Sequence, residues 1–155
     1  MRERNTIVND IHSQLNATRV NRIFRPASID EVRDVVRSAT ARNHPLAIAG
    51  GRHAMGGQQF AQDADLLDLT RLDDIFAFDA ERGEVEAAAG ITWPALIDWL
   101  HAAQPDTSRP WSIIQKQTGA DRLTLGGALA ANVHGRVLGR APIIADLGAF
   151  TPLGA

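Results

Sequence analysis

Residues 47–60, AIAGGRHAMGGQQF, place four glycines around an arginine and a histidine, directly after a short apolar run. Holding glycine in one conformation costs backbone entropy, so such a cluster needs a reason. The spacing is not G-x-G-x-x-G, because Arg52 stands at the second glycine position, and it is not a P-loop, because Gly57-Gln58 replaces Lys-Ser/Thr. Two interpretations stay open: a glycine-rich turn, or a loop whose amides bind an anion such as a pyrophosphate.

The residues before this loop predict a β-α-β unit. The segment RIFRP, residues 22–26, predicts a short strand that ends at Pro26. Ser28 and Glu31 have the spacing of a capping box, and the apolar residues after them recur at helical spacing. The apolar run at 45–50 predicts a buried strand, so the glycine loop follows the second strand of the unit.

The rest of the chain predicts further strands and helices. We expect a strand in 63–72, a hairpin in 75–90, a helix in 92–104 capped by Thr92, and strands in 111–117 and 143–155. Residues 124–135, TLGGALAANVHG, predict a short helix entered through two glycines, whose exposed amides suit an anion. The alternative is close packing of this helix against a sheet. Two glycine-rich anion sites together favour a ligand with at least two phosphates.

The composition excludes several classes of function. The chain has 155 residues, a formal net charge of −2 and no cysteine, which excludes disulfides, iron–sulfur clusters and a cysteine nucleophile. Scattered basic residues and 5% aromatic residues give no reason to expect nucleic acid as a partner. Without a signal peptide or a long apolar run, we expect no membrane contact and a cytoplasmic protein.

The remaining polar residues indicate neither a metal site nor a hydrolase. The five histidines have no metal-ligand spacing, and no serine has a nucleophile-elbow context. We expect the following residues at the surface or on a solvated acidic rim: His44, His101, Asp68, Asp73, Asp74 and Asp79.

Several motifs, in order along the chain, resemble the FAD-binding domain of the vanillyl-alcohol oxidase/p-cresol methylhydroxylase (PCMH) family of flavoproteins. They include RIFRPASIDEVRDVVRSA at 22–39, PLAIAGGRHAMGGQ at 45–58, VEAAAGITWPALIDWL at 85–100 and TGADRLTLGGALAANVHG at 118–135. The resemblance implies an α+β, PCMH-type fold with two small α/β lobes and mixed sheets, truncated at its C-terminal side. It implies an N-terminal arm in 1–20, a partial FAD-binding domain in 21–155, and no substrate domain.

The resemblance also implies where FAD would bind. In many members the histidine at the position of His53 is bonded to the 8α carbon of the isoalloxazine ring, so we expect His53 to attach the flavin covalently. Ala54 replaces the serine common in the family, which leaves the phosphate to main-chain amides. The expected FAD-binding residues are Gly50, Gly51, Arg52, His53, Ala54, Gly57, Gln58, Asp121, Thr124, Gly126, Gly127, Ala131, Asn132, His134 and Gly135.

The implied chemistry is hydride transfer from an alcohol, sugar or amine-type substrate to N5 of FAD, followed by reoxidation by oxygen or another acceptor. No catalytic residue is assigned, because in the family the substrate pocket and the usual base lie beyond this segment. The alternative is a truncated, non-catalytic module that oligomerises or docks to a second chain. That alternative relies on the expected C-terminal strand, which would present an unpaired edge.

Overall fold

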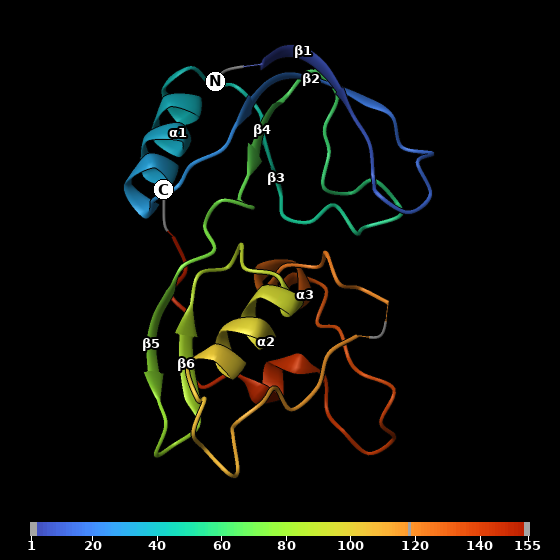
Figure 1. Ribbon diagram of the computed structural model, residues 1–155. Coiled ribbons are helices and arrows are strands. Elements are labelled where there is room, and N and C mark those ends of the chain that lie inside the picture. The colour runs from blue at the N-terminus through green and yellow to red at the C-terminus, as the bar shows by residue number, and fades with distance from the viewer. Residues whose placement is uncertain (1–2, 118, 154–155) are drawn as a thin grey trace. The chain divides into compact units, whose positions relative to one another are not determined.

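The computed structural model describes residues 3–117 and 119–153, which fall into two compact units (Figure 1). Of the described residues, 3–72 and 151–153 belong to the first unit, and those between 73 and 150 belong to the second. Each unit has its own buried apolar cluster. The expected α+β fold, with mixed sheets in two small lobes, is confirmed.

The first unit contains a four-stranded mixed sheet in the order β1-β2-β4-β3. Strand β1 (Glu3–Val8) pairs antiparallel with β2 (Thr18–Phe24), so much of the expected N-terminal arm is a strand of the sheet. Strands β2 and β3 (Leu46–Ala49) both run parallel to β4 (Asp65–Asp68), which lies between them. The expected β-α-β unit is therefore present, with a later strand inserted at its centre.

Helix α1 (Ile29–Ala41) connects β2 to β3 and begins as the sequence predicts (Figure 1). The Ser28 hydroxyl accepts a hydrogen bond from the Glu31 amide at 3.2 Å, and the Glu31 carboxylate accepts one from the Ala27 amide at 2.8 Å. The first bond satisfies an amide of the first turn, and the second ties the Glu31 side chain back to the residue before the N-cap. After the helix, Asn43 adopts a left-handed conformation (φ 47°) that reverses the chain toward β3.

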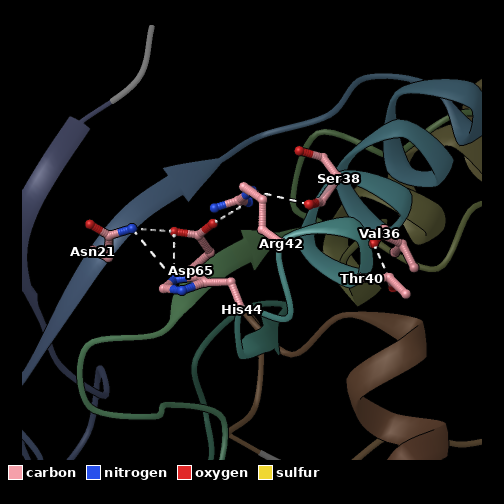
Figure 2. Close-up of polar contacts among 7 residues, drawn as sticks. All are labelled: Asn21, Val36, Ser38, Thr40, Arg42, His44 and Asp65. Atoms are coloured by element: carbon pink, nitrogen blue, oxygen red, sulfur yellow. Dashed lines mark hydrogen bonds and ion pairs between the residues drawn. The ribbon is translucent and has the colours of Figure 1, made fainter.

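A buried carboxylate joins four segments of the first unit (Figure 2). Asp65, at the start of β4, is fully buried and accepts hydrogen bonds from Asn21 at 2.7 Å and from Arg42 at 2.9 Å. The His44 imidazole lies 3.4 Å from the same carboxylate. These contacts tie β4 to β2, to the end of α1 and to the segment that leads into β3.

Two surface expectations in this unit are wrong. His44 is half-buried beside Asp65 instead of lying on the surface. Asp68 is buried at the end of β4, where its carboxylate accepts a hydrogen bond from the Thr70 hydroxyl and lies 3.5 Å from Arg25. Both side chains can be buried for the same reason: each has a hydrogen-bonding or charged partner beside it.

The second unit combines a hairpin with short helices. Strands β5 (Ile75–Asp79) and β6 (Glu84–Ala87) form the expected antiparallel pair. Its helices are α2 (Trp93–Ala102), α3 (Leu125–Ala130) and the 3₁₀ helix η1 (Ile143–Asp146). Buried side chains of these helices and of the irregular residues before them form one cluster: Ile91, Trp93, Leu96, Leu100, Ala120, Leu123, Ala128 and Ile143.

Helix α2 starts where the sequence predicts, but not by the expected cap. Thr92 occupies the N-cap position, yet its side chain makes no capping hydrogen bond. Its backbone instead forms an isolated antiparallel bridge with Thr124, the residue that precedes α3. The starts of the two helices are therefore connected through backbone pairing.

Two expected strands are absent from the described residues. Residues 111–117 are irregular, because the Gln104 side chain bonds both the amide (2.8 Å) and the carbonyl (3.1 Å) of Trp111, groups that a strand partner would otherwise use. Residues 143–153 form η1 and an irregular tail, and residues 154–155 of that expected strand lie outside the described part. The unpaired strand edge on which the docking alternative relied does not form there.

The described helices do not include one with the length and apolar character needed to cross a membrane.

Candidate functional site

The first glycine loop, residues 50–59, follows β3 and depends on two unusual backbone conformations. Arg52 (φ 56°) and Gly57 (φ 70°) are both left-handed. A Cβ atom at Gly57 would lie 2.9 Å from the side chain of Asn16, closer than real Cβ contacts allow. Gly57 is therefore required both for its backbone conformation and for the close approach of Asn16.

Several main-chain amides of the first glycine loop make no hydrogen bond to the described residues. Within the described part of the chain, the amides of Gly50, Gly51, Arg52 and Ala54 donate no hydrogen bond. The Gly57 amide is used locally and bonds the Ala54 carbonyl at 3.2 Å. A series of unused donors at a strand end is the arrangement that binds phosphate oxygens.

A compact segment between β1 and β2, residues 9–17, lies against this loop and is called the N-terminal turn below. Its centre is Asp10, whose side chain is buried. The carboxylate accepts hydrogen bonds from the amides of His12 (3.0 Å) and Ser13 (2.6 Å) and from the Asn16 side chain (2.8 Å). Burial by itself raises the pKa of Asp10, but hydrogen bonds from the side chain of Asn16, from the hydroxyl and amide of Ser13 and from the amide of Gln14 outweigh it and hold the pKa well below its ordinary value.

The N-terminal turn and the first glycine loop are joined by side-chain and backbone contacts. These are Ile11 amide to Arg52 carbonyl at 3.1 Å, Asn16 Nδ2 to Met55 carbonyl at 2.6 Å, and His12 Nε2 to His53 Nδ1 at 2.6 Å. The two imidazole rings meet edge to face, with centroids 4.5 Å apart. The ring of His53, the expected flavin attachment point, is therefore held through one of its nitrogens.

One residue of the loop that sequence reasoning missed is Gln59. Its Oε1 and Nε2 atoms are both buried and have no hydrogen-bond partner among the described residues. Leaving such a buried group unsatisfied costs about 1–3 kcal/mol, so a polar ligand here would be stabilising. Together with the unused amides, this side chain fits a loop that holds a polar, anionic cofactor. No sequence signal distinguishes it from the adjacent Gln58, which is exposed.

The second glycine-rich segment, residues 124–135, lies in the second unit and differs from the first loop. The expectation of exposed amides at the start of α3 is wrong, because they are already bonded: Leu125 to the Ile91 carbonyl (2.9 Å), Gly126 to the Ala89 carbonyl (2.8 Å) and Gly127 to the Thr124 hydroxyl (3.2 Å). A Cβ atom at Gly126 would lie 3.0 Å from the Cβ of Ala89. The close-packing interpretation therefore explains this glycine.

The end of this segment is arranged around a side chain that the sequence analysis also missed. Gln115 accepts a hydrogen bond from the Gly135 amide at 3.1 Å and donates to the Ala141 carbonyl at 2.8 Å and to Asp146 at 2.7 Å. It thereby fixes the segment that carries His134, whose own side chain is exposed. A glutamine in an irregular stretch gives no sequence pattern that reveals this role.

The other expected residues of the second segment are also near its surface. Ala131 is the C-cap residue after α3, and Asn132 is left-handed (φ 43°); both are exposed. Asp121 is exposed as well and forms an ion pair with Lys116. Residue 118, the first of the motif at 118–135, lies outside the described residues.

The family of this chain is shown by its sequence over almost its whole length. Residues 20–154 match the family described as FAD binding domain. The chain belongs to this family, which includes FAD-dependent oxidoreductases, and its cofactor is FAD. The resemblance to the vanillyl-alcohol oxidase/PCMH flavoproteins is confirmed.

Known relatives are much longer than this chain. L-gulonolactone oxidase of Bos taurus is 24% identical over 111 residues, which cover 72% of this chain and 23% of the oxidase. Two solved structures share the fold: alkyldihydroxyacetonephosphate synthase (TM-score 0.70, 20% identity, 84% of this chain and 25% of that one) and aclacinomycin oxidoreductase (TM-score 0.67, 15% identity, 87% and 27%). The chain thus spans about a quarter of each of these proteins.

Proposed function

We propose that this chain is the FAD-binding part of an oxidoreductase that transfers hydride from an alcohol, sugar or amine-type substrate to FAD, which oxygen or another acceptor then reoxidises. The observation that carries the proposal is the first glycine loop, where main-chain amides after a parallel strand remain without hydrogen bonds within the described chain. Membership of the FAD-binding family supports it. The bovine relative, named for the oxidation of a sugar lactone, supports a carbon–hydrogen bond next to oxygen as the electron donor.

The first glycine loop supplies the donors for the diphosphate in this proposal. The amides of Gly50, Gly51, Arg52 and Ala54 would bind its oxygens, since anions are favoured where several main-chain donors converge. The hydroxyl that the family's serine would add is absent at Ala54, which increases the dependence on these amides. FAD, when bound, supplies the hydride acceptor, while the chain orients it and sets its surroundings.

His53 is the proposed covalent attachment point. An imidazole with one unprotonated nitrogen is nucleophilic near neutral pH, and no cysteine exists in the chain to form a second bond. In the second unit, we assign a role beside the cofactor to the exposed residues Asn132 and His134 and to Gly135. The amides of the glycines in α3 already donate hydrogen bonds within the chain. These glycines would therefore contribute only through their lack of a side chain, which lets the cofactor approach the helix.

His53→Ala tests the site directly. The 155-residue wild-type chain, incubated with FAD, should be yellow, absorb near 450 nm and keep its colour after acid precipitation, with an intact mass raised by one flavin. His53→Ala should lose the acid-stable colour and the added mass while retaining reversible FAD binding, and His101→Ala, at an exposed position in α2, serves as the control.

The possible results separate the parts of the proposal. A wild-type chain that releases all its flavin in acid shows that His53 is not an attachment point, although the fold and reversible binding would stand. A chain that cannot be loaded with FAD under any condition contradicts FAD binding by these residues. The flavin of the loaded chain loses its yellow colour when a donor reduces it without oxygen. If a sugar lactone does this but simple alcohols and amines do not, the electron donor is a sugar-type compound.

A further inference from the structure

Gln59, near the end of the first glycine loop, has a polar head without hydrogen bonds to the described residues. Its Oε1 and Nε2 atoms are both buried. A glutamine amide offers two N–H donors and a carbonyl acceptor, and such groups are normally buried only where they gain partners. A buried amide without any partner in the described part of the chain therefore needs an explanation.

Two consecutive turns place Gln59 close to the amides proposed to bind the diphosphate. The Gly57 amide donates to the Ala54 carbonyl at 3.2 Å, and the Phe60 amide donates to the Gly57 carbonyl at 2.9 Å. Each turn brings its first and last residues to within about 7 Å, so the chain does not lead directly away from Ala54. Gln59 lies inside the second turn and therefore remains near Ala54, the last of these amides.

The backbone on both sides of Gln59 is held in place. Before it, Asn16 of the N-terminal turn donates to the Met55 carbonyl at 2.6 Å. After it, Phe60 packs against the apolar cluster of the first unit. The head of Gln59 has no hydrogen bond to the described residues that it would have to break. Rotation of this side chain between its rotamers is therefore the movement of lowest cost that exposes the amide.

We propose that Gln59 is a binding residue for the cofactor, and that its amide turns outward to hydrogen-bond neighbouring hydroxyl groups beside the diphosphate. The inference rests on the proposed FAD site in the first glycine loop. The head indicates hydroxyls because these groups both donate and accept, so two neighbouring ones can pair with Oε1 and with Nε2. Diphosphate oxygens only accept near neutral pH and would leave Oε1 unpaired. FAD carries neighbouring hydroxyls on both sides of its diphosphate, on the ribityl chain and on the ribose.

Gln59→Met tests the proposal, because methionine has nearly the length and shape of glutamine without its polar head. Gln62→Met, at an exposed position shortly after the loop, is the matched control. Both substitutions are made in the 155-residue chain carrying His53→Ala, which keeps FAD binding reversible. Two quantities are measured: the dissociation constant of FAD by isothermal titration calorimetry, and the hydrogen exchange of peptides from β2 and β4 without FAD.

We expect Gln59→Met to bind FAD about tenfold more weakly, because it loses the hydrogen bonds of the amide. Without FAD, its first unit should exchange no faster than that of the parent chain, because the apolar head replaces a buried amide that has no partner among the described residues. Gln62→Met should match the parent chain in both measurements. A side chain that only supported the fold would instead speed exchange when replaced.

FMN and ADP, measured as competitors of FAD, identify which hydroxyls Gln59 binds. FMN carries the ribityl chain without the ribose, and ADP carries the ribose without the ribityl chain. If Gln59→Met weakens the binding of FMN alone, the ribityl hydroxyls are assigned, and if it weakens the binding of ADP alone, the ribose hydroxyls are assigned. An equal loss for both indicates contact with the phosphate that they share, and it refutes the assignment to hydroxyls.

The remaining outcomes separate this inference from the proposed function. Unchanged FAD affinity in Gln59→Met refutes the role of Gln59 and leaves the proposed function standing, because water then satisfies the buried amide. The role is also refuted if the affinity falls only together with faster exchange of the first unit, or if FAD is weakened while FMN and ADP are both unaffected. A chain that binds no FAD, with or without His53→Ala, refutes the proposed function and the inference with it.

Discussion

Replacing Asp65 with asparagine tests how the first unit is held together, because it keeps the shape of a buried side chain and removes its charge. Asp65 is fully buried and accepts hydrogen bonds from Asn21 and Arg42, with His44 3.4 Å away (Figure 2). Asn21 and Arg42 donate N–H groups to the carboxylate. His44 can do so as well when its Nε2 atom carries a proton. The amide group of an asparagine must turn its own NH₂ toward at least one of them.

The expected loss of stability follows from these contacts. A hydrogen bond to a charged group contributes about 1.5–3 kcal/mol and a neutral one about 0.5–1.5 kcal/mol. In Asp65→Asn the bond from Asn21 becomes neutral and the bond from Arg42 keeps a charge on one side only, so the loss over both bonds is about 2–3 kcal/mol. Arg42 is 37% exposed, so water solvates part of its released charge. We therefore expect Asp65→Asn to lower the free energy of unfolding of the first unit by about 2 kcal/mol, and Asp65→Ala by about 3 kcal/mol.

The effect should depend on pH in a defined direction. Burial by itself raises the pKa of Asp65, but hydrogen bonds from Arg42 and Asn21 and the charges of His44 and Arg42 outweigh it, so the pKa lies below its ordinary value. A carboxyl with a lowered folded-state pKa stabilises the fold fully above its unfolded pKa of about 4 and loses that contribution as the pH falls through the folded value. The difference between wild type and Asp65→Asn should accordingly shrink in acid.

Hydrogen exchange measured by mass spectrometry on peptides from β2 and β4 reports the first unit directly. The three tryptophans, Trp93, Trp99 and Trp111, all lie in the second unit, so their fluorescence provides an internal reference during denaturation. Asp63→Asn is the matched control, because Asp63 pairs with Arg19 in the same unit but both are more than half exposed; its effect should be much smaller. Equal protection in Asp65→Asn and Asp63→Asn would refute the reasoning.

Two further predictions concern the second unit and use tryptophan fluorescence or hydrogen exchange. Gly126→Ala places a methyl group 3.0 Å from the Cβ of Ala89 and should destabilise this unit by about 1–3 kcal/mol. Gly148→Ala, where a Cβ would meet no atom within 4 Å, is the control and should leave the stability unchanged. Equal effects of the two substitutions would contradict close packing at α3. Gln115→Ala removes the hydrogen bonds of this side chain to the Gly135 amide, the Ala141 carbonyl and Asp146, and it should raise amide hydrogen exchange in residues 133–141. Unchanged exchange would show that another contact fixes these residues.

The sequence predicted the first unit well because its signals are local. Pro26 ends the segment after β2, Ser28 and Glu31 form the cap of α1, and Asn43 reverses the chain after the helix. The glycine loop follows β3 as expected. The sequence did not show that β4 lies between β2 and β3 in the sheet. Strand order could not be predicted because it depends on contacts between segments that are distant in the sequence.

Two expected strands failed because an apolar run shows that a segment is buried, not what it pairs with. Ile113 packs against the core of the second unit, and Ile143 is part of that core, yet neither lies in a strand. Around Trp111, the side chain of Gln104 takes the place of a strand partner. A single glutamine seven residues earlier in the chain gives no pattern that predicts this.

The position of the first glycine loop after β3 was predicted from the sequence, but its contacts were not. Glycine spacing and the preceding apolar run were enough to find the first loop. The polar residues Asp10 and Asn16 indicate a turn by their type, but nothing local shows that this turn packs against the first glycine loop. Likewise, the amides of α3 are used by Ala89 and Ile91, which lie more than 30 residues earlier.

The two glycine-rich segments therefore differ in what their glycines accomplish. In the first, Gly57 allows a left-handed turn and the neighbouring amides make no hydrogen bond within the described chain. In the second, Gly126 lets the helix approach Ala89, and the first-turn amides are already bonded. Since main-chain donors are what meet the charge of a diphosphate at a glycine loop, we assign that charge to the first segment. Substitutions there should weaken FAD binding before they weaken the fold, and substitutions at α3 should do the reverse.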